Sequence, residues 1–187
     1  CRAAGVECVL GVSAADQNSL GAELADRAVV LGPAPARDSY LNLPLIVHAA
    51  AATGCDALHP GYGFLSECAE LAALCEENEI NFIGPRPETI DLLGDKLQAR
   101  EQAKQAGLAR VPGSAALAGA DAARAAAAEI GYPVVMKASA GGGGRGMFVA
   151  RDPESIERSF KRASTEALAS FGDGTLYMEA YVENARH

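Results

Sequence analysis

The sequence predicts an α/β protein with a doubly wound parallel sheet, a helical linker and a small α+β domain, in that order. Residues 1–84 alternate short apolar runs with helical stretches, which is typical of parallel strands joined by crossover helices. The segment Gly84-Pro85-Arg86-Pro87 then interrupts the chain. After Val111 the order changes to helix, hairpin, helix, strand, with a run of glycines inside the hairpin.

The first 84 residues are expected to fold as one doubly wound domain. Two helices are predicted here, Tyr40–Thr53 with Ser39 as N-cap and Glu67–Asn78 with Ser66 as N-cap. The repeated order of strand, helix and strand indicates right-handed crossovers. The opening residues CRAAG resemble the end of a helix without its preceding strand, so we expect this domain to be incomplete at its N-terminus. The predicted strands are Val6–Val12, Ala28–Leu31, Cys55–Leu58 and Ile80–Ile83.

Residues 85–110 are predicted to form a helical linker. One helix, Glu88–Leu93, has Pro87 at its first position, and a second, Asp95–Ala106, stops at Gly107. Residues 111–187 are predicted to form the small α+β domain, whose long second helix begins at Asp152-Pro153 and fades near Ser170. The other elements predicted in it are a helix at Asp121–Ile130 and strands at Val134–Ala138, Met147–Ala150 and Leu176–Glu179.

Composition excludes several classes of protein. The chain has 187 residues, 49% of them apolar and 21% charged, so it can bury a core and is not disordered. Its net charge of −8 and the lack of a basic stripe argue against a nucleic-acid partner. No apolar run approaches the roughly 20 residues that a membrane-spanning helix needs. Five cysteines without a CxxC motif indicate reduced thiols in a reducing compartment, and no Cys/His pair has metal-ligand spacing.

The segment KASAGGGGRGM, Lys137 to Met147, is the strongest chemical signal. A Rossmann fingerprint would lead from a strand into a helix, and a Walker A loop would end in Gly-Lys-Ser/Thr. Here a strand is predicted on both sides, which favours a hairpin lid over phosphates. Glycines let backbone N–H groups approach an anion closely, and Lys137 can supply a positive charge beneath them. The alternative is a flexible hairpin tip beside an unrelated lysine.

Four motifs together resemble the biotin carboxylases, the ATP-grasp component of biotin-dependent carboxylases of the acetyl-CoA, propionyl-CoA or pyruvate carboxylase type. They are HPGYGFLSE (His59–Glu67), GDK (Gly94–Lys96), KASAGGGGRGM and MEAYVENARH (Met178–His187). The resemblance implies a Rossmann-like, pre-ATP-grasp N-terminal domain and an ATP-grasp lid. It also implies that ATP and bicarbonate give carboxyphosphate, from which the carboxyl group passes to biotin on a carrier protein.

The resemblance also assigns roles to residues of this chain. Tyr62 and Glu67 are implied on the side that faces biotin and bicarbonate. Glu179 is implied to accept from the adenine amino group, and the Val182 N–H to donate to a ring nitrogen. Ala180 stands where the family often has lysine, so one polar contact to the nucleotide is lost. The residues implied to bind ATP are Lys96, Lys137, Gly141, Gly142, Gly143, Gly144, Arg145, Gly146, Met147, Glu179, Val182 and His187.

The magnesium ligands, the catalytic base and the biotin-orienting arginine of the family lie beyond His187, so no catalytic or metal residue is assigned in this chain. We therefore expect a fragment that lacks the C-terminal catalytic domain and is inactive alone. The implied cofactors are ATP, Mg²⁺ and biotin. The implied partners are bicarbonate, a biotinylated carrier protein and a carboxyltransferase, with a homodimer or larger complex as the assembly. The expected compartment is the cytoplasm, or the mitochondrial matrix in a eukaryote.

Two other functions remain open from the sequence. Another ATP-grasp carboxylate–amine ligase, or a carbamoyl-phosphate-forming enzyme, would share the glycine lid and the adenine strand. A non-catalytic nucleotide-binding module would share them as well. Taken alone, Lys96 in a helix rich in Lys and Arg would be a solvated surface charge, so its assignment depends on the resemblance.

Overall fold

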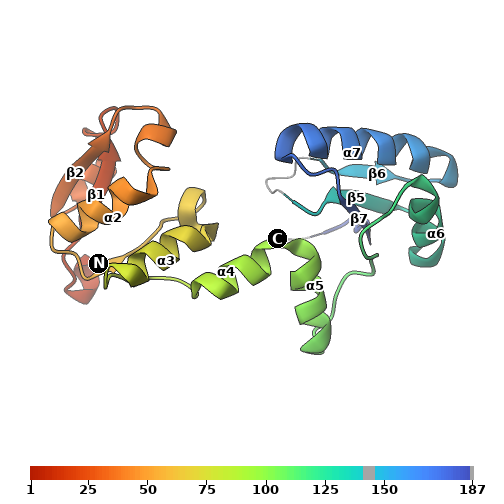
Figure 1. The fold of residues 1–187 in the computed structure, drawn as a ribbon, viewed down its shortest axis with the longest axis horizontal. Coiled ribbons are helices and arrows are strands. Elements are labelled where there is room, and N and C mark those ends of the chain that lie inside the picture. Colours follow the sequence, from red (N-terminus) through yellow and green to blue (C-terminus); the bar gives the residue numbers. More distant parts are fainter. Residues whose placement is uncertain (141–145, 186–187) are drawn as a thin grey trace. The chain divides into compact units, whose positions relative to one another are not determined.

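The computed structural model describes residues 1–140 and 146–185. The chain divides into two compact units, Cys1–Leu92 and Leu93–His187, and each is described by itself (Figure 1). Both units mix helices and strands, which confirms the predicted α/β class. Among the described residues, no helix is both long and apolar enough to cross a membrane.

The first unit contains two pairs of parallel strands. Val9 pairs with Arg27 at the start of one pair, and Ala57 pairs with Asn81 at the start of the other. The predicted parallel pairing is therefore confirmed, but the described strands pair only two by two and do not form one continuous sheet. A five-residue helix that the sequence analysis did not name lies between the first two strands. The elements of this unit are β1 (Val9–Ser13), α1 (Leu20–Leu24), β2 (Arg27–Gly32), α2 (Leu43–Ala52), β3 (Ala57–Leu58), α3 (Ala69–Glu77) and β4 (Asn81–Phe82).

The core of the first unit is built from α2, α3 and the segment that follows them. Leu71 and Cys75 lie one turn apart on α3 and are almost completely buried. They pack with Val47 from α2 and Phe82 from β4. Burial raises the pKa of the Cys75 thiol, because a thiolate would lose its hydration there.

The predicted N-cap at Ser39 is wrong. The helix α2 begins at Leu43, and its N-cap is Asn42, whose side chain accepts from the N–H of Leu45 at 3.2 Å. Ser39 instead ends a short 3₁₀ turn, and its hydroxyl donates to the carbonyl of Pro35 at 3.0 Å. The local turn therefore uses the hydroxyl that the prediction assigned to a helix start.

The predicted helix start at Ser66 and Glu67 is also wrong. Residues Phe64–Glu67 form a separate 3₁₀ turn, and α3 begins only at Ala69, after an N-cap at Cys68 that makes no side-chain hydrogen bond. Gly63 has a φ of 75° and Phe64 a φ of 43°. Cys68, between the turn and α3, has an extended backbone with a φ of −100° and a ψ of 102°, so the turn stays distinct from α3.

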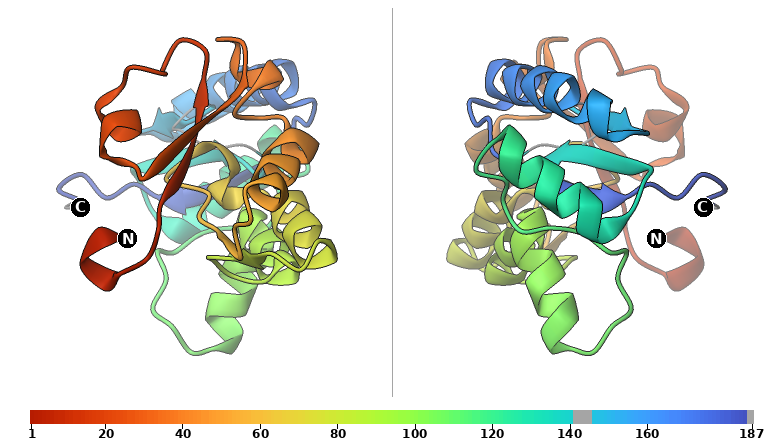
Figure 2. Two further views of the ribbon diagram at one scale, coloured as in Figure 1. Left: turned by 90° about the vertical axis from the view of Figure 1, so that its left-hand side faces the viewer. Right: turned by 90° about the vertical axis from the view of Figure 1, so that its right-hand side faces the viewer.

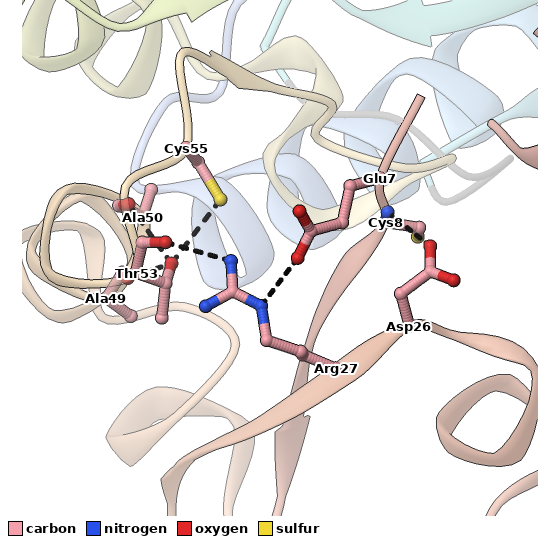
Figure 3. A network of polar contacts seen from close by, with 8 residues as sticks. All are labelled: Glu7, Cys8, Asp26, Arg27, Ala49, Ala50, Thr53 and Cys55. Atoms are coloured by element: carbon pink, nitrogen blue, oxygen red, sulfur yellow. Dashed lines mark hydrogen bonds and ion pairs between the residues drawn. The ribbon is translucent and has the colours of Figure 1, made fainter. Parts of the chain in front are cut away.

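A polar network ties the start of β2 to the end of α2 (Figure 3). Arg27 donates from Nε to Glu7 at 2.8 Å and from Nη2 to the carbonyl of Thr53 at 2.9 Å. The Thr53 hydroxyl donates to the carbonyl of Ala49 at 2.7 Å, so it satisfies an acceptor in the last turn of α2. A guanidinium beside the carboxyl end of a helix also complements the helix dipole.

Two short helices, α4 (Pro87–Gly94) and α5 (Lys96–Gln105), follow β4 along the chain, as predicted. Asp95 caps α5 by accepting from the N–H of Gln98 at 2.8 Å. Gly107, where the helix was predicted to stop, follows it with a φ of 68°, in the left-handed conformation.

The second unit is a three-stranded antiparallel sheet covered on one face by two helices (Figures 1 and 2). The strand order is β6-β5-β7, so β5 lies in the centre and pairs with both others. Asp152 caps a 3₁₀ turn at Pro153–Ser155 that leads into the long helix. The elements are α6 (Ala120–Ile130), β5 (Val134–Ala138), β6 (Phe148–Ala150), α7 (Ile156–Phe171) and β7 (Leu176–Ala180).

Alternation along the strands separates the two faces of this sheet. Val134 and Met136 on β5 and Met178 on β7 point into the core beneath α6 and α7. The helices contribute small residues there, such as Ala127 and Ala163, so that they approach the sheet closely. The residues between these positions therefore lie on the opposite face.

Candidate functional site

Lys137 and Glu179 meet on the face of the second unit's sheet that lies opposite α6 and α7. Lys137 on β5 pairs with Tyr177 on β7, and Val135 pairs with Glu179. The side chains of Lys137 and Glu179 are therefore diagonal neighbours on one face. The Lys137 ammonium donates to Glu179 Oε2 at 2.5 Å.

A second cation reaches the same carboxylate. Arg100 on α5 donates from Nη1 to Glu179 Oε1, so each carboxylate oxygen has its own positive partner. The three side chains are largely withdrawn from water, with 13% of Glu179, 16% of Arg100 and 28% of Lys137 exposed. One carboxylate and two cations leave this cluster with a formal charge of +1.

Arg100 is held by three further features of the second unit. Its Nη2 donates to the carbonyl of Val111 at 3.1 Å, and its guanidinium lies 6.0 Å from the centre of the Tyr177 ring. A methyl group at Gly113 would stand 2.5 Å from Arg100 Nη2, so a glycine is needed at this close approach. Arg100 could not be singled out from the sequence, because it is one of several basic residues on a polar helix.

Tyr177 lies beneath this cluster and is 3% exposed. Burial raises the pKa of Tyr177 to about 12, the negative charge of Glu179 adds to the increase, and Arg100 opposes it. The phenol is therefore neutral throughout the physiological pH range.

Lys96 occupies the first position of α5, four residues before Arg100. Residues four apart on a helix share one face, so the structure gives Lys96 and Arg100 the same direction from α5. Val182 is half-exposed and lies two residues beyond the end of β7. The contacts of Lys96 and Val182 to a nucleotide stay a prediction.

One end of the glycine run is described. Gly146 has a φ of 69°, and its N–H donates to the carboxylate of Glu166 on α7 at 3.0 Å. Met147, the next residue, is half-exposed. Gly141–Arg145 and His187, which the sequence analysis assigned to ATP, lie outside the described residues.

The two residues predicted on the biotin and bicarbonate side belong to the first unit. Tyr62 is fully exposed, and Glu67 ends the 3₁₀ turn that precedes α3.

The hydroxyl of Tyr40 donates to Asp16 at 2.5 Å and accepts from the N–H of Ser13 at 2.8 Å. Hydrogen bonds from Ser13 and Tyr40 hold the pKa of Asp16 below its ordinary value.

Side chains that could bind a metal do not gather anywhere in residues 1–140 and 146–185. Within these ranges no three His, Cys, Asp or Glu side chains come together in a way that could hold a metal ion.

Two family models match the chain, one to each half. Residues 1–90 match the biotin carboxylase N-terminal domain, and residues 95–187 match the ATP-binding domain of the carbamoyl-phosphate synthase L chain. The two matches together cover most of the 187 residues.

Among curated proteins, the chain is similar to biotin carboxylases. It is 47% identical to biotin carboxylase 2, chloroplastic, of Populus trichocarpa over 98% of this chain and 35% of that protein. It is also 47% identical to biotin carboxylase 1 of Bacillus subtilis (strain 168), over 100% of this chain and 42% of that protein. The chain therefore spans roughly two fifths of the length of these relatives.

Solved structures give the same result. A biotin carboxylase–beta-gamma-ATP complex from Campylobacter jejuni matches with a TM-score of 0.90 and 44% identity, over 98% of this chain and 41% of that one. The biotin carboxylase domain dimer of Hydrogenobacter thermophilus 2-oxoglutarate carboxylase, in complex with MgADP, ADP and bicarbonate, matches with a TM-score of 0.88 and 44% identity. That match covers 98% of this chain and 41% of the other.

Proposed function

The chain belongs to the biotin carboxylase family, whose members are ATP-dependent ligases, and from this premise we propose that the full-length protein carboxylates biotin on a carrier protein. Bicarbonate attacks the γ-phosphorus of ATP, the bond to the β,γ-bridging oxygen breaks, and ADP leaves. The carboxyphosphate so formed releases phosphate as its carboxyl group passes to biotin. The reaction class is phosphoryl transfer followed by carboxyl transfer.

The proposed domain organisation follows the sequence analysis. Residues 1–84 are the N-terminal doubly wound domain, 85–110 the helical linker and 111–187 the ATP-grasp lid. The parallel strand pairs of the first unit and the helix-covered antiparallel sheet of the second support this division.

The cluster of Lys137, Glu179 and Arg100 is the observation that carries the proposal. An ATP tail needs positive charge placed where water is partly excluded, and a carboxylate suits the exocyclic amino group of adenine. We propose that Lys137 and Lys96 contact the phosphates, that residues 141–147 close over them, and that Glu179 and Val182 contact the adenine. His187 is proposed as a further contact to the nucleotide.

Tyr62 and Glu67 are proposed on the side that receives biotin and bicarbonate. Magnesium would neutralise part of the phosphate charge when bound. The described residues hold no set of ligands for magnesium, so none of them is proposed to bind it.

The proposed partners include the biotinylated carrier and a carboxyltransferase. The dimer in the Hydrogenobacter thermophilus structure supports an assembly of at least two copies. The names of the plant relatives place them in chloroplasts. A bacterial protein is proposed to act in the cytoplasm, and the mitochondrial matrix stays a prediction for a eukaryote.

A carbamoyl-phosphate-forming reaction is the second candidate, because residues 95–187 match an ATP-binding domain named for that synthase. Both reactions begin with ATP and bicarbonate, so the acceptor distinguishes them. The test measures ADP release by the full-length protein with Mg-ATP and bicarbonate, adding either biotin or ammonia. Stimulation by biotin supports the proposed function, and stimulation by ammonia alone supports the second candidate. ATP binding without turnover would identify a nucleotide-binding module.

A further inference from the structure

The proposed role of Lys137 conflicts with the contact that it makes. Its ammonium is paired with Glu179 at 2.5 Å, whereas the proposed function needs that ammonium at a phosphate. A lysine that leaves Glu179 would remove one of the two cations that neutralise a carboxylate only 13% exposed. A carboxylate left without a partner in such surroundings is strongly destabilised.

Arg100 resolves this conflict, because it neutralises the same carboxylate from the other side. Its contact is to Oε1, whereas Lys137 contacts Oε2, so either cation can leave without disturbing the other bond. With Arg100 in place, the departure of Lys137 leaves Glu179 paired with Arg100. This remaining pair has no net charge.

The two cations are not equally free to move. Arg100 also donates to the carbonyl of Val111, lies over the Tyr177 ring, and fills the space that Gly113 leaves open. Its planar guanidinium is always charged and loses these contacts together if it turns away. Lys137 carries a compact ammonium on a flexible stem and is the more exposed of the two, so it is the cation that can turn to a ligand.

We propose that Arg100 is a positioning residue, the resident counter-ion of Glu179 that releases Lys137 to the nucleotide phosphates. The inference rests on the proposed function, because it needs a phosphate ligand on this face of the sheet. Without Arg100, Glu179 retains Lys137, and ATP must break a lysine–carboxylate pair before it gains the lysine.

The experiment measures ATP affinity of the full-length protein by calorimetry and follows biotin-dependent ADP release in parallel. Arg100→Met removes the counter-ion and should weaken ATP binding about tenfold or more. Arg100→Lys keeps a positive charge and should stay within about threefold of the wild type. Arg124→Met is the matched control, because Arg124 forms ion pairs with Asp121 and Glu157 in the same unit, away from this cluster.

The second arm distinguishes this role from general damage to the fold. Glu179→Gln removes the charge that retains Lys137 but keeps an oxygen that can accept from an amino group. In that background, Arg100→Met should change ATP affinity by less than about threefold, because no carboxylate remains to hold the lysine. If Arg100 served only the fold, Arg100→Met would lower ATP affinity by the same factor with and without Glu179→Gln.

Thermal unfolding of every variant accompanies these measurements. If Arg100→Met does not fold, Arg100→Gln replaces it, since glutamine keeps a polar side chain and removes the charge. Wild-type affinity in the uncharged variant, or an equal loss with and without Glu179→Gln, overturns the inference. A wild-type protein that binds ATP and carboxylates biotin while the variants fail these expectations leaves the proposed function standing. If the wild-type protein does not bind ATP, both the inference on Arg100 and the proposed function are wrong.

Discussion

The ring of Tyr40 stacks on the ring of Phe64, with centroids 6.2 Å apart and planes inclined by 12°. The Tyr40 hydroxyl is fixed to Asp16 and to the backbone of Ser13, at the end of β1. Phe64 has a φ of 43°, which is costly for a bulky residue and persists only where neighbouring contacts impose it. The stack therefore connects the end of β1 to the turn that follows Tyr62.

We predict that this contact orders the segment from Gly61 to Glu67. Tyr40→Leu removes the stack and the hydroxyl, which together are worth about 1–3 kcal/mol, so hydrogen exchange in the segment should accelerate. Tyr40→Phe keeps the stack and should accelerate exchange less. The two variants are compared by mass spectrometry, and equal protection in Tyr40→Leu and wild type would show that the ring does not order the turn.

A second prediction concerns Asp16 and pH. Its pKa is lowered in the folded state by hydrogen bonds from Ser13 and Tyr40. A lowered pKa adds stability that is fully present above the ordinary value of about 3.9 and is lost as the pH falls through the folded value. The stability difference between wild type and Asp16→Asn should therefore shrink below about pH 4. Urea unfolding at several pH values measures it, and a difference independent of pH would contradict the hydrogen-bonding assignment.

Gly113 provides a third test. An added methyl group would stand 2.5 Å from Arg100 Nη2 and 2.7 Å from the Met178 carbonyl, so Gly113→Ala must displace the arginine, the strand or both. We expect a loss of about 1–3 kcal/mol in stability and weaker ATP binding. Gly119→Ala is the control, because nothing lies within 4 Å of the added methyl there. Indistinguishable unfolding and binding in the two variants would show that the close approach is not needed.

Lys137→Met is the fourth test, made in the full-length protein. It keeps the length of the side chain and removes its charge, so ATP affinity should fall about tenfold or more. Lys161→Met, on the exposed side of α7, is the control for the loss of a lysine. ATP affinity and turnover that match this control would mean that Lys137 serves the fold alone.

Much of the second unit could be predicted because its signals are local. The run Val134–Ala138 forms β5 as predicted, and the helix predicted at Asp95–Ala106 is α5, Lys96–Gln105. The two serine caps failed because more than one nearby polar group could serve. Asn42 lies closer to the start of α2 than Ser39, and the extended backbone at Cys68 separates Ser66 from α3.

The site was only partly predictable for a different reason. Lys137 and Glu179 lie on strands whose motifs mark them, whereas Arg100 reaches Glu179 across 79 positions of sequence. No local pattern distinguishes it from Lys104 or Arg110, which lie nearby in the same basic stretch. The segment that follows α5 pairs with β7 at Gly113 and Glu179, and its Val111 carbonyl accepts from Arg100, so only the tertiary structure selects this arginine.

The buried thiol of Cys75 on α3 allows the opening of the first unit to be followed by chemical modification. All five cysteines of the 187 residues lie between Cys1 and Cys75, so a thiol reagent modifies this unit and leaves the second untouched. Cys75 is completely buried, whereas Cys1 is exposed, and modification of Cys75 must wait until α3 separates from its core. The modification rate of Cys75, divided by its rate in the unfolded chain, therefore gives the opening equilibrium of this unit without a dye, a mutation or a ligand.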